Sequence, residues 1–101
     1  MIEVSGSSRL PFVVHTRDLV IEVLEGGSRF HVDAFRNRPG EEVDLLEGRL
    51  RVRKSYHSTT DNEPEELAGG EMVMINKDID LMEKEKLSPA ELDKVKEKVR
   101  N

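Results

Sequence analysis

Four short apolar pieces decide the fold of this chain. They read PFVVHT at residues 11–16, LVIEVL at 19–24, RFHVDAF at 29–35 and EVDLLEGRLRVR at 42–53. Each piece is rich in Val, Ile, Leu or Phe and is bounded by Gly, Pro, Asn or Asp. Short apolar and β-branched runs between such turn residues are typical of successive β-strands. The sequence therefore predicts a small β-domain built around residues 11–53.

Alternation within these pieces predicts which side chains face the core. In residues 29–35 every second residue is apolar, so Phe30, Val32 and Ala34 are expected on the core side of a half-buried strand. Residues 12–16 are almost continuously apolar, which indicates burial on both faces or a helix-like alternative. The β-branched content and short length favour a strand.

The last piece predicts a β-hairpin over residues 43–52. Two alternating runs meet there at Glu47-Gly48, and a Gly-containing pair between such runs is a hairpin signal. The acidic first arm is then expected to neutralise the basic second arm across the pair. The acidic residues concerned are Glu41, Glu42, Asp44 and Glu47.

The rest of the chain is more polar. Residues 55–66 predict a long flexible loop, 72–76 one further strand and 77–86 a charged linker. A C-terminal helix begins at Pro89, because Ser88 and Glu91 have the spacing of a capping box and Pro suits the first helical position. Apolar residues at Leu92, Val95 and Val99 mark its packing face. About seven or eight short strands are therefore expected before one helix.

Composition narrows the function. The chain has 101 residues, a net charge of −5 and no cysteine, which favours one domain and disfavours general binding to nucleic acid or anionic membranes. Disulfides and thiolate metal sites are excluded. No apolar run has the roughly 18 residues of a membrane span, and the first residues do not resemble a signal peptide.

A basic stripe is the candidate contact surface. Arg49, Arg51 and Arg53 alternate along one face of a predicted strand, and Arg36 and Arg38 extend the stripe if they lie nearby. The stripe is either a site for an acidic protein partner or a phosphate backbone, or it is the solvated face of a half-exposed strand. We take it as the candidate protein-binding site, and we expect charge reversal there to preserve the fold and weaken partner binding.

Other chemistry has weaker signals. His15 and His31 on neighbouring strands, together with Asp33 or Glu22, are an alternative metal site, although scattered histidines without a spaced pair are weak evidence. His57 lies in the polar loop and is expected to be solvated. We find no nucleophile motif or phosphate loop and predict neither enzyme activity nor a cofactor.

The order of the pieces resembles the periplasmic domain of the FecR family of membrane-anchored sigma-factor regulators. The matching elements are PFVVHT, IEVL, FHVDAF, VDLLEG followed by LRV, and then LAGGE at residues 67–71 with the strand at 72–76. The family motif places Phe12, Phe30, Leu45, Leu46 and Gly48 at positions that are interpreted as core and turn. The resemblance covers about residues 2–76.

Several features depart from the family pattern. The link from Leu24 to Phe30 is longer than the usual turn, and Gly69 stands where Pro is usual. The aromatic-rich strand that usually precedes PF is reduced to residues 2–4. Residues after Asp78 do not follow the family continuation, and no part of the chain matches the family's cytoplasmic, transmembrane or C-terminal signalling regions.

The resemblance implies a non-catalytic periplasmic domain of an inner-membrane anti-sigma regulator. Such a domain relays a signal from a TonB-dependent outer-membrane transporter to an extracytoplasmic-function sigma factor. The predicted fold is all-β, with sequential, mostly antiparallel strands in a twisted solenoid-like or sandwich arrangement and a C-terminal helix. Residues 1–76 form the β-domain, and 77–101 form a charged linker and helix. A small β-domain that binds a small ligand or carbohydrate is the alternative.

Overall fold

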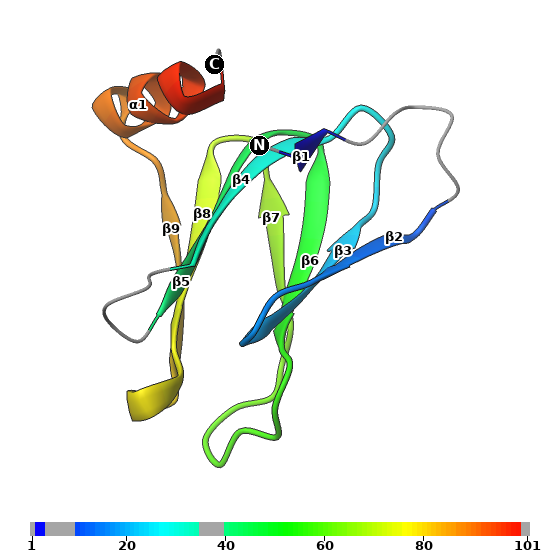
Figure 1. Cartoon of the computed structure of the whole chain (residues 1–101), viewed down its shortest axis with the longest axis vertical. Coiled ribbons are helices and arrows are strands. Elements are labelled where there is room, and N and C mark those ends of the chain that lie inside the picture. Colours follow the sequence, from blue (N-terminus) through cyan, green and yellow to red (C-terminus); the bar gives the residue numbers. More distant parts are fainter. Residues whose placement is uncertain (1, 4–9, 35–39, 100–101) are drawn as a thin grey trace.

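The computed structural model describes residues 2–3, 10–34 and 40–99. Two antiparallel sheets form a sandwich, with one helix at the end of the chain (Figure 1). The first sheet has the strand order β1-β4-β5-β8-β9, and the second has the order β2-β3-β6-β7. The prediction of an all-β fold with a C-terminal helix is confirmed, and the sandwich is the arrangement that the described residues adopt.

The strands are short, as the alternating pieces predicted. Their bounds are β1 Ile2–Glu3, β2 Phe12–His15, β3 Leu19–Val23, β4 Arg29–Ala34, β5 Glu41–Glu47, β6 Arg49–Lys54, β7 Glu65–Ala68, β8 Glu71–Asn76 and β9 Leu81–Lys86. A 3-10 turn, η1 (Lys77–Ile79), joins β8 to β9, and the helix α1 spans Pro89–Val99. Of the residues predicted as a short first strand, only Ile2 and Glu3 lie in the described part of the chain. Arg36 and Arg38, the residues that could extend the basic stripe, also lie outside the described residues.

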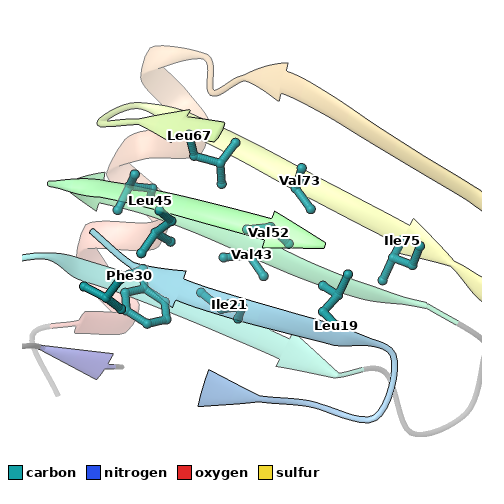
Figure 2. Close-up of a cluster of buried hydrophobic side chains, with 11 residues drawn as sticks. Leu19, Ile21, Phe30, Val43, Leu45, Val52, Leu67, Val73 and Ile75 are labelled. Carbon is teal, nitrogen blue, oxygen red and sulfur yellow. The ribbon is translucent and has the colours of Figure 1, made fainter. Parts of the chain in front are cut away.

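Apolar side chains from both sheets fill the space between them (Figure 2). Phe30 and Leu45 are fully buried there, and Val32 packs against this core, as their alternation predicted. The side chain of Ala34 lies outside the described residues. The other fully buried members include Leu19, Ile21, Val23, Val43, Leu50, Val52, Val73 and Ile75. Burial of this apolar surface is the main stabilising contribution to the sandwich.

The predicted hairpin at residues 43–52 is wrong. β5 pairs with β4 and β8, whereas β6 pairs with β3 and β7, so the two segments belong to different sheets. Gly48 links them with a φ of 100° and carries the chain across the sandwich. A Cβ at this position would lie 2.0 Å from Ser28 Oγ. The same glycine signal therefore marks a corner between sheets, where two backbones approach closely.

The burial predicted for residues 12–16 is also wrong. β2 is an edge strand, and Phe12 and Val13 are 43% and 42% exposed. Only one face of the strand meets the sandwich, where Val14 packs against the core. Phe12 therefore does not occupy the core position that the family motif suggested, and Leu46 is only half-buried.

The stretch predicted as a charged linker is part of the first sheet. After η1, Leu81–Lys86 pairs with β8 along its whole length and forms the edge strand β9. The charged side chains on both sides of this strand concealed its extended structure, because an edge strand with exposed faces lacks the apolar alternation of a half-buried one. β7, at the end of the predicted loop, has only four residues and places Leu67 in the core.

The helix begins as predicted. Ser88 Oγ accepts a hydrogen bond from the Glu91 backbone N–H at 3.2 Å, and Glu91 Oε1 accepts one from the Ser88 N–H at 3.1 Å. This is the reciprocal capping box. Val95 is buried and Leu92 is half-buried, and α1 contacts β5. The helix therefore packs against the first sheet, which compensates for its short length.

Glu41 occupies an unexpected place in the sandwich. Its side chain is fully buried on the core side of β5, although the sequence suggested an exposed position beside the basic stripe. Its Oε1 accepts hydrogen bonds from Thr16 Oγ1 at 2.5 Å and from the Asp18 backbone N–H at 3.0 Å. A residue of the first sheet thus holds the turn between β2 and β3 in the second sheet.

Candidate functional site

The open edges of the two sheets differ in their suitability for binding. β7 has Glu65 and Glu66, and β9 alternates Glu and Lys over its last four residues. β1 has two residues in the described part of the chain. β2 contains no Asp, Glu, Lys or Arg, and Phe12, Val13 and His15 are exposed on it. Charged or very short edges resist pairing with other chains, so β2 is the edge in the described part of the chain that is least protected against it.

Further apolar exposure lies at the start of this edge. Leu10 is 40% exposed immediately before the first β2 residues, in the segment Leu10-Pro11-Phe12-Val13. Ile79 and Leu81, at 65% and 43% exposed, lie at the turn between β8 and β9 in the other sheet. The exposed apolar residues of β2 therefore form a continuous short segment, which we call the β2 edge and define as residues 10–15.

The basic stripe lies on the outer face of the second sheet. Arg49 and Arg51 both donate hydrogen bonds to Glu66 on β7, at 3.3 and 3.1 Å. Arg51 also lies 3.7 Å from Glu22 on β3. The hydrogen bond from Arg51, with the charges of both arginines, lowers the pKa of Glu66. Arg53 is exposed further along β6.

Neutralisation of the stripe therefore comes from different residues than predicted. The acidic residues of β5 lie in the other sheet, and Asp44 is buried there as Glu41 is. Glu22 and Glu66 neutralise the stripe instead, because they flank β6 within its own sheet. The geometry is that of a solvated, charge-balanced strand face, and exposed ion pairs of this kind contribute little to stability.

A polar cluster around Asp80 was not predicted from the sequence. Its carboxylate accepts hydrogen bonds from Ser58 Oγ at 2.7 Å, Tyr56 Oη at 3.0 Å, Lys54 Nζ at 3.2 Å and the Thr59 backbone N–H at 3.0 Å. The hydrogen bond from Ser58, with those from Lys54 and Tyr56, holds the pKa of Asp80 well below its usual range. Burial, together with the hydrogen bond to Asp80, raises the pKa of Tyr56 to about 12.

This cluster ties the loop after β6 to the turn between β8 and β9, both at the lower end of Figure 1. Asp80 adopts the left-handed conformation, with φ 51° and ψ 45°, which Asp tolerates better than most residues. Asn62 adds two hydrogen bonds to the backbone of Ser58, at 2.7 and 2.9 Å. The loop predicted to be a flexible connection is therefore cross-linked by hydrogen bonds.

Ser58 and Lys54 lie side by side in this cluster, and both donate hydrogen bonds to Asp80. Lys54 Nζ donates to Ser58 Oγ at 2.9 Å, but it also lies 3.2 Å from the Asp80 carboxylate. Ser58 is 3% exposed, and its hydroxyl donates to Asp80. These contacts hold the loop in place.

A small cavity lies beside the cluster. Its volume is about 190 Å³, and its lining includes Lys54, Asp61, Glu63, Asp80 and Met82. Pockets for small organic ligands are commonly about 300–1,000 Å³ and mostly apolar. The cavity is smaller and has several charged residues, so it gives little support to the ligand-binding alternative.

The histidines do not come together. His15 lies on β2 in the second sheet and His31 on β4 in the first. His31 Nδ1 lies 3.9 Å from the buried Asp44 carboxylate, and His57 is exposed in the loop. No group of three His, Cys, Asp or Glu residues among those described could hold a metal ion. The alternative metal site at His15 and His31 is therefore wrong.

Comparisons with known proteins identify no relative. The chain matches no family model, no curated protein and no solved structure. Within the described ranges, no helix is both long and apolar enough to cross a lipid bilayer.

Proposed function

We propose that this chain is a non-catalytic protein-interaction domain in transmembrane signalling. Its source would be the periplasmic part of a FecR-type regulator that is anchored in the bacterial inner membrane. In this role the domain relays a signal from a TonB-dependent outer-membrane transporter to an extracytoplasmic-function sigma factor. The order and spacing of the sequence elements at residues 2–76 support this assignment.

The β2 edge is the observation on which the interaction role rests. It combines exposed apolar side chains with a strand that has no Asp, Glu, Lys or Arg, at the margin of a sheet. Extended peptides often bind by adding a strand to such an edge, with backbone hydrogen bonds for affinity and side-chain contacts for specificity. The edge is attached to a packed sandwich, so a partner bound there would contact a preformed surface.

Signal transmission requires no chemistry in the domain itself. A partner that binds one conformation of the regulator more tightly than another shifts the populations of the two. The contact surface then determines which conformation is favoured. This mechanism is compatible with a domain whose polar cluster, around Asp80, serves to hold a loop.

The basic stripe is the second candidate contact surface. Arg49, Arg51 and Arg53 remain the sequence-based prediction for a protein-binding face. The ion pairs of Arg49 and Arg51 with Glu66 reduce the net charge of that face, so the β2 edge has more support.

The test is an NMR titration of the whole ¹⁵N-labelled chain with the periplasmic signalling domain of the transporter encoded nearest to it. We expect shift changes localised to one face, centred on the β2 edge. Reversing all three charges of the stripe should leave the spectrum of a folded domain, and unchanged affinity in that variant would remove the stripe as a contact surface. The absence of shift changes at millimolar partner would refute the proposed function for this chain.

A further inference from the structure

We infer that the β2 edge binds an extended segment of another protein, which adds a fifth strand to the sheet β2-β3-β6-β7. This inference rests on the proposed function and specifies the form of the partner. The backbone of β2 shows where the added strand would hydrogen bond. The surrounding side chains and charges then define its chemistry.

The pairing of β2 with β3 determines which backbone groups face outward. The Thr16 N–H donates to Leu19 O at 2.9 Å, so the two residues form a hydrogen-bonded pair in this antiparallel register. Hydrogen-bonded and non-hydrogen-bonded pairs alternate along such strands. The N–H and C=O groups of Val13 and His15 therefore point away from β3, toward the edge where no strand of the described residues pairs with β2.

The pairing of β3 with β6 independently gives the same directions for the backbone groups. Leu24 N–H donates to Arg49 O at 3.0 Å, and Ser55 N–H donates to Asp18 O at 2.9 Å. In this register, the backbone groups of Glu22 point toward Arg51 on β6. Glu22 is the partner of Val13 in the β2–β3 ladder, so Val13 has its backbone groups directed to the other side.

The side chains of β2 define the pattern of the incoming strand. Val14 lies opposite the buried Ile21 and packs against the core, so Phe12 and Val14 are on the core side of the sheet. Val13 and His15 are on the outer side. A strand placed against this edge covers Phe12 best when its alternate residues are apolar. The partner segment therefore has apolar residues at every second position.

A second copy of this chain is a poorer occupant than a flexible segment. The four residues of β2 extend only about 13 Å at about 3.3 Å per residue, so pairing of two such edges buries little surface. Stable protein interfaces commonly bury about 1,200 Å² or more in total. Two copies would also repel one another, because each has a net charge of −5. A neutral or basic extended segment avoids this repulsion.

The test uses three synthetic peptides and the whole chain. The first peptide, TVKVKVT, alternates apolar and basic residues, and TVEVEVT is its acidic match. The third, TVKPKVT, has a central proline that prevents regular strand pairing. We expect the NMR shift changes caused by the basic peptide to centre on residues 12–16. The proline peptide should bind at least about tenfold more weakly, because it loses backbone hydrogen bonds to β2.

Substitutions at Val13 test the backbone contact directly. Val13→Pro removes an N–H that points to the open edge, a position where proline is compatible with a strand. We expect it to weaken binding of the basic peptide at least about tenfold, while Val13→Thr keeps the N–H and should retain affinity within about twofold. If Val13→Pro does not fold, Val13→Lys is the replacement, and it should weaken the basic peptide relative to the acidic one.

Several results would overturn the inference. These are unchanged affinity in folded Val13→Pro, equal binding of the proline peptide, preference for the acidic peptide, or shift changes centred on the basic stripe. A dimer of the chain alone in sedimentation velocity, lost in Val13→Pro, would assign the edge to a second copy instead. If the transporter domain binds wild type and Val13→Pro equally, the proposed function survives and this inference fails. If only the peptide binds, the inference survives and the proposed function fails.

Discussion

Replacing Glu41 by alanine tests whether one buried carboxylate holds the two sheets together. The side chain is fully buried and accepts hydrogen bonds from Thr16 Oγ1 and the Asp18 N–H. Glu41→Ala leaves the buried Asp18 N–H without this acceptor, which costs about 1–3 kcal/mol. Loss of the side-chain packing adds about 1 kcal/mol. We expect the free energy of unfolding to fall by about 3 kcal/mol.

The Thr16 hydroxyl limits this estimate. It also contacts Leu19 O at 3.4 Å, so it retains an acceptor when Glu41 is removed. The principal loss is therefore at Asp18, whose backbone N–H is buried. Glu41→Gln is the matched control, because its side-chain carbonyl can still accept from the Asp18 N–H. A neutral acceptor is weaker than a carboxylate, so the glutamine variant should lose only about 1 kcal/mol.

Urea unfolding followed by far-UV circular dichroism measures both effects, since the chain has no Trp and one Tyr. A loss of about 3 kcal/mol corresponds to a decrease in Tm of about 12–24 °C for a domain of this size. The slope of the urea transition should stay unchanged, because the surface exposed on unfolding is similar. A loss below about 1 kcal/mol in Glu41→Ala, or an equal loss in Glu41→Gln, would refute the role assigned to these hydrogen bonds.

Three further predictions concern other parts of the fold. Gly48→Ala should lower the free energy of unfolding in urea by about 2–4 kcal/mol, because the new Cβ would strain the left-handed backbone and overlap with Ser28. A urea midpoint equal to that of the wild type would contradict the close approach of Gly48 to Ser28. Tyr56 should titrate near pH 12 when followed by ultraviolet absorbance. Because its pKa in the folded protein is raised above the usual value of about 10, its contribution to stability is complete below pH 10 and is lost toward pH 12. Titration of Tyr56 at about pH 10 would contradict its burial beside Asp80. Ser88→Ala should destabilise α1 by about 1 kcal/mol, seen as faster amide exchange in the helix, whereas unchanged exchange would argue against the cap.

Local chemistry determined much of the secondary structure. The alternation around Phe30 predicted a strand with that side chain in the core, and the structure confirms both. The spacing of Ser88 and Glu91 predicted the start of the helix, because a capping box involves only neighbouring residues. Such features depend on interactions a few residues apart, which the order of amino acids specifies directly.

Strand pairing depended on the tertiary structure. A glycine such as Gly48 can mark either a hairpin turn or a corner between two sheets. Its presence in the sequence does not specify which strands pair with β5 and β6. β9 was hidden because an exposed edge strand has no apolar alternation, although its backbone pairs fully with β8. Local sequence encodes an extended conformation better than it encodes the partner of that conformation.

The candidate site shows the same division. The sequence alone determined that β2 is apolar and that Arg49, Arg51 and Arg53 share one face. Only the tertiary structure placed β2 at an open edge, and only it paired Arg51 with Glu22 and Glu66. Burial and ion pairing depend on residues that are distant along the chain, so the two sheets had to be assembled before exposure and charge balance were decided.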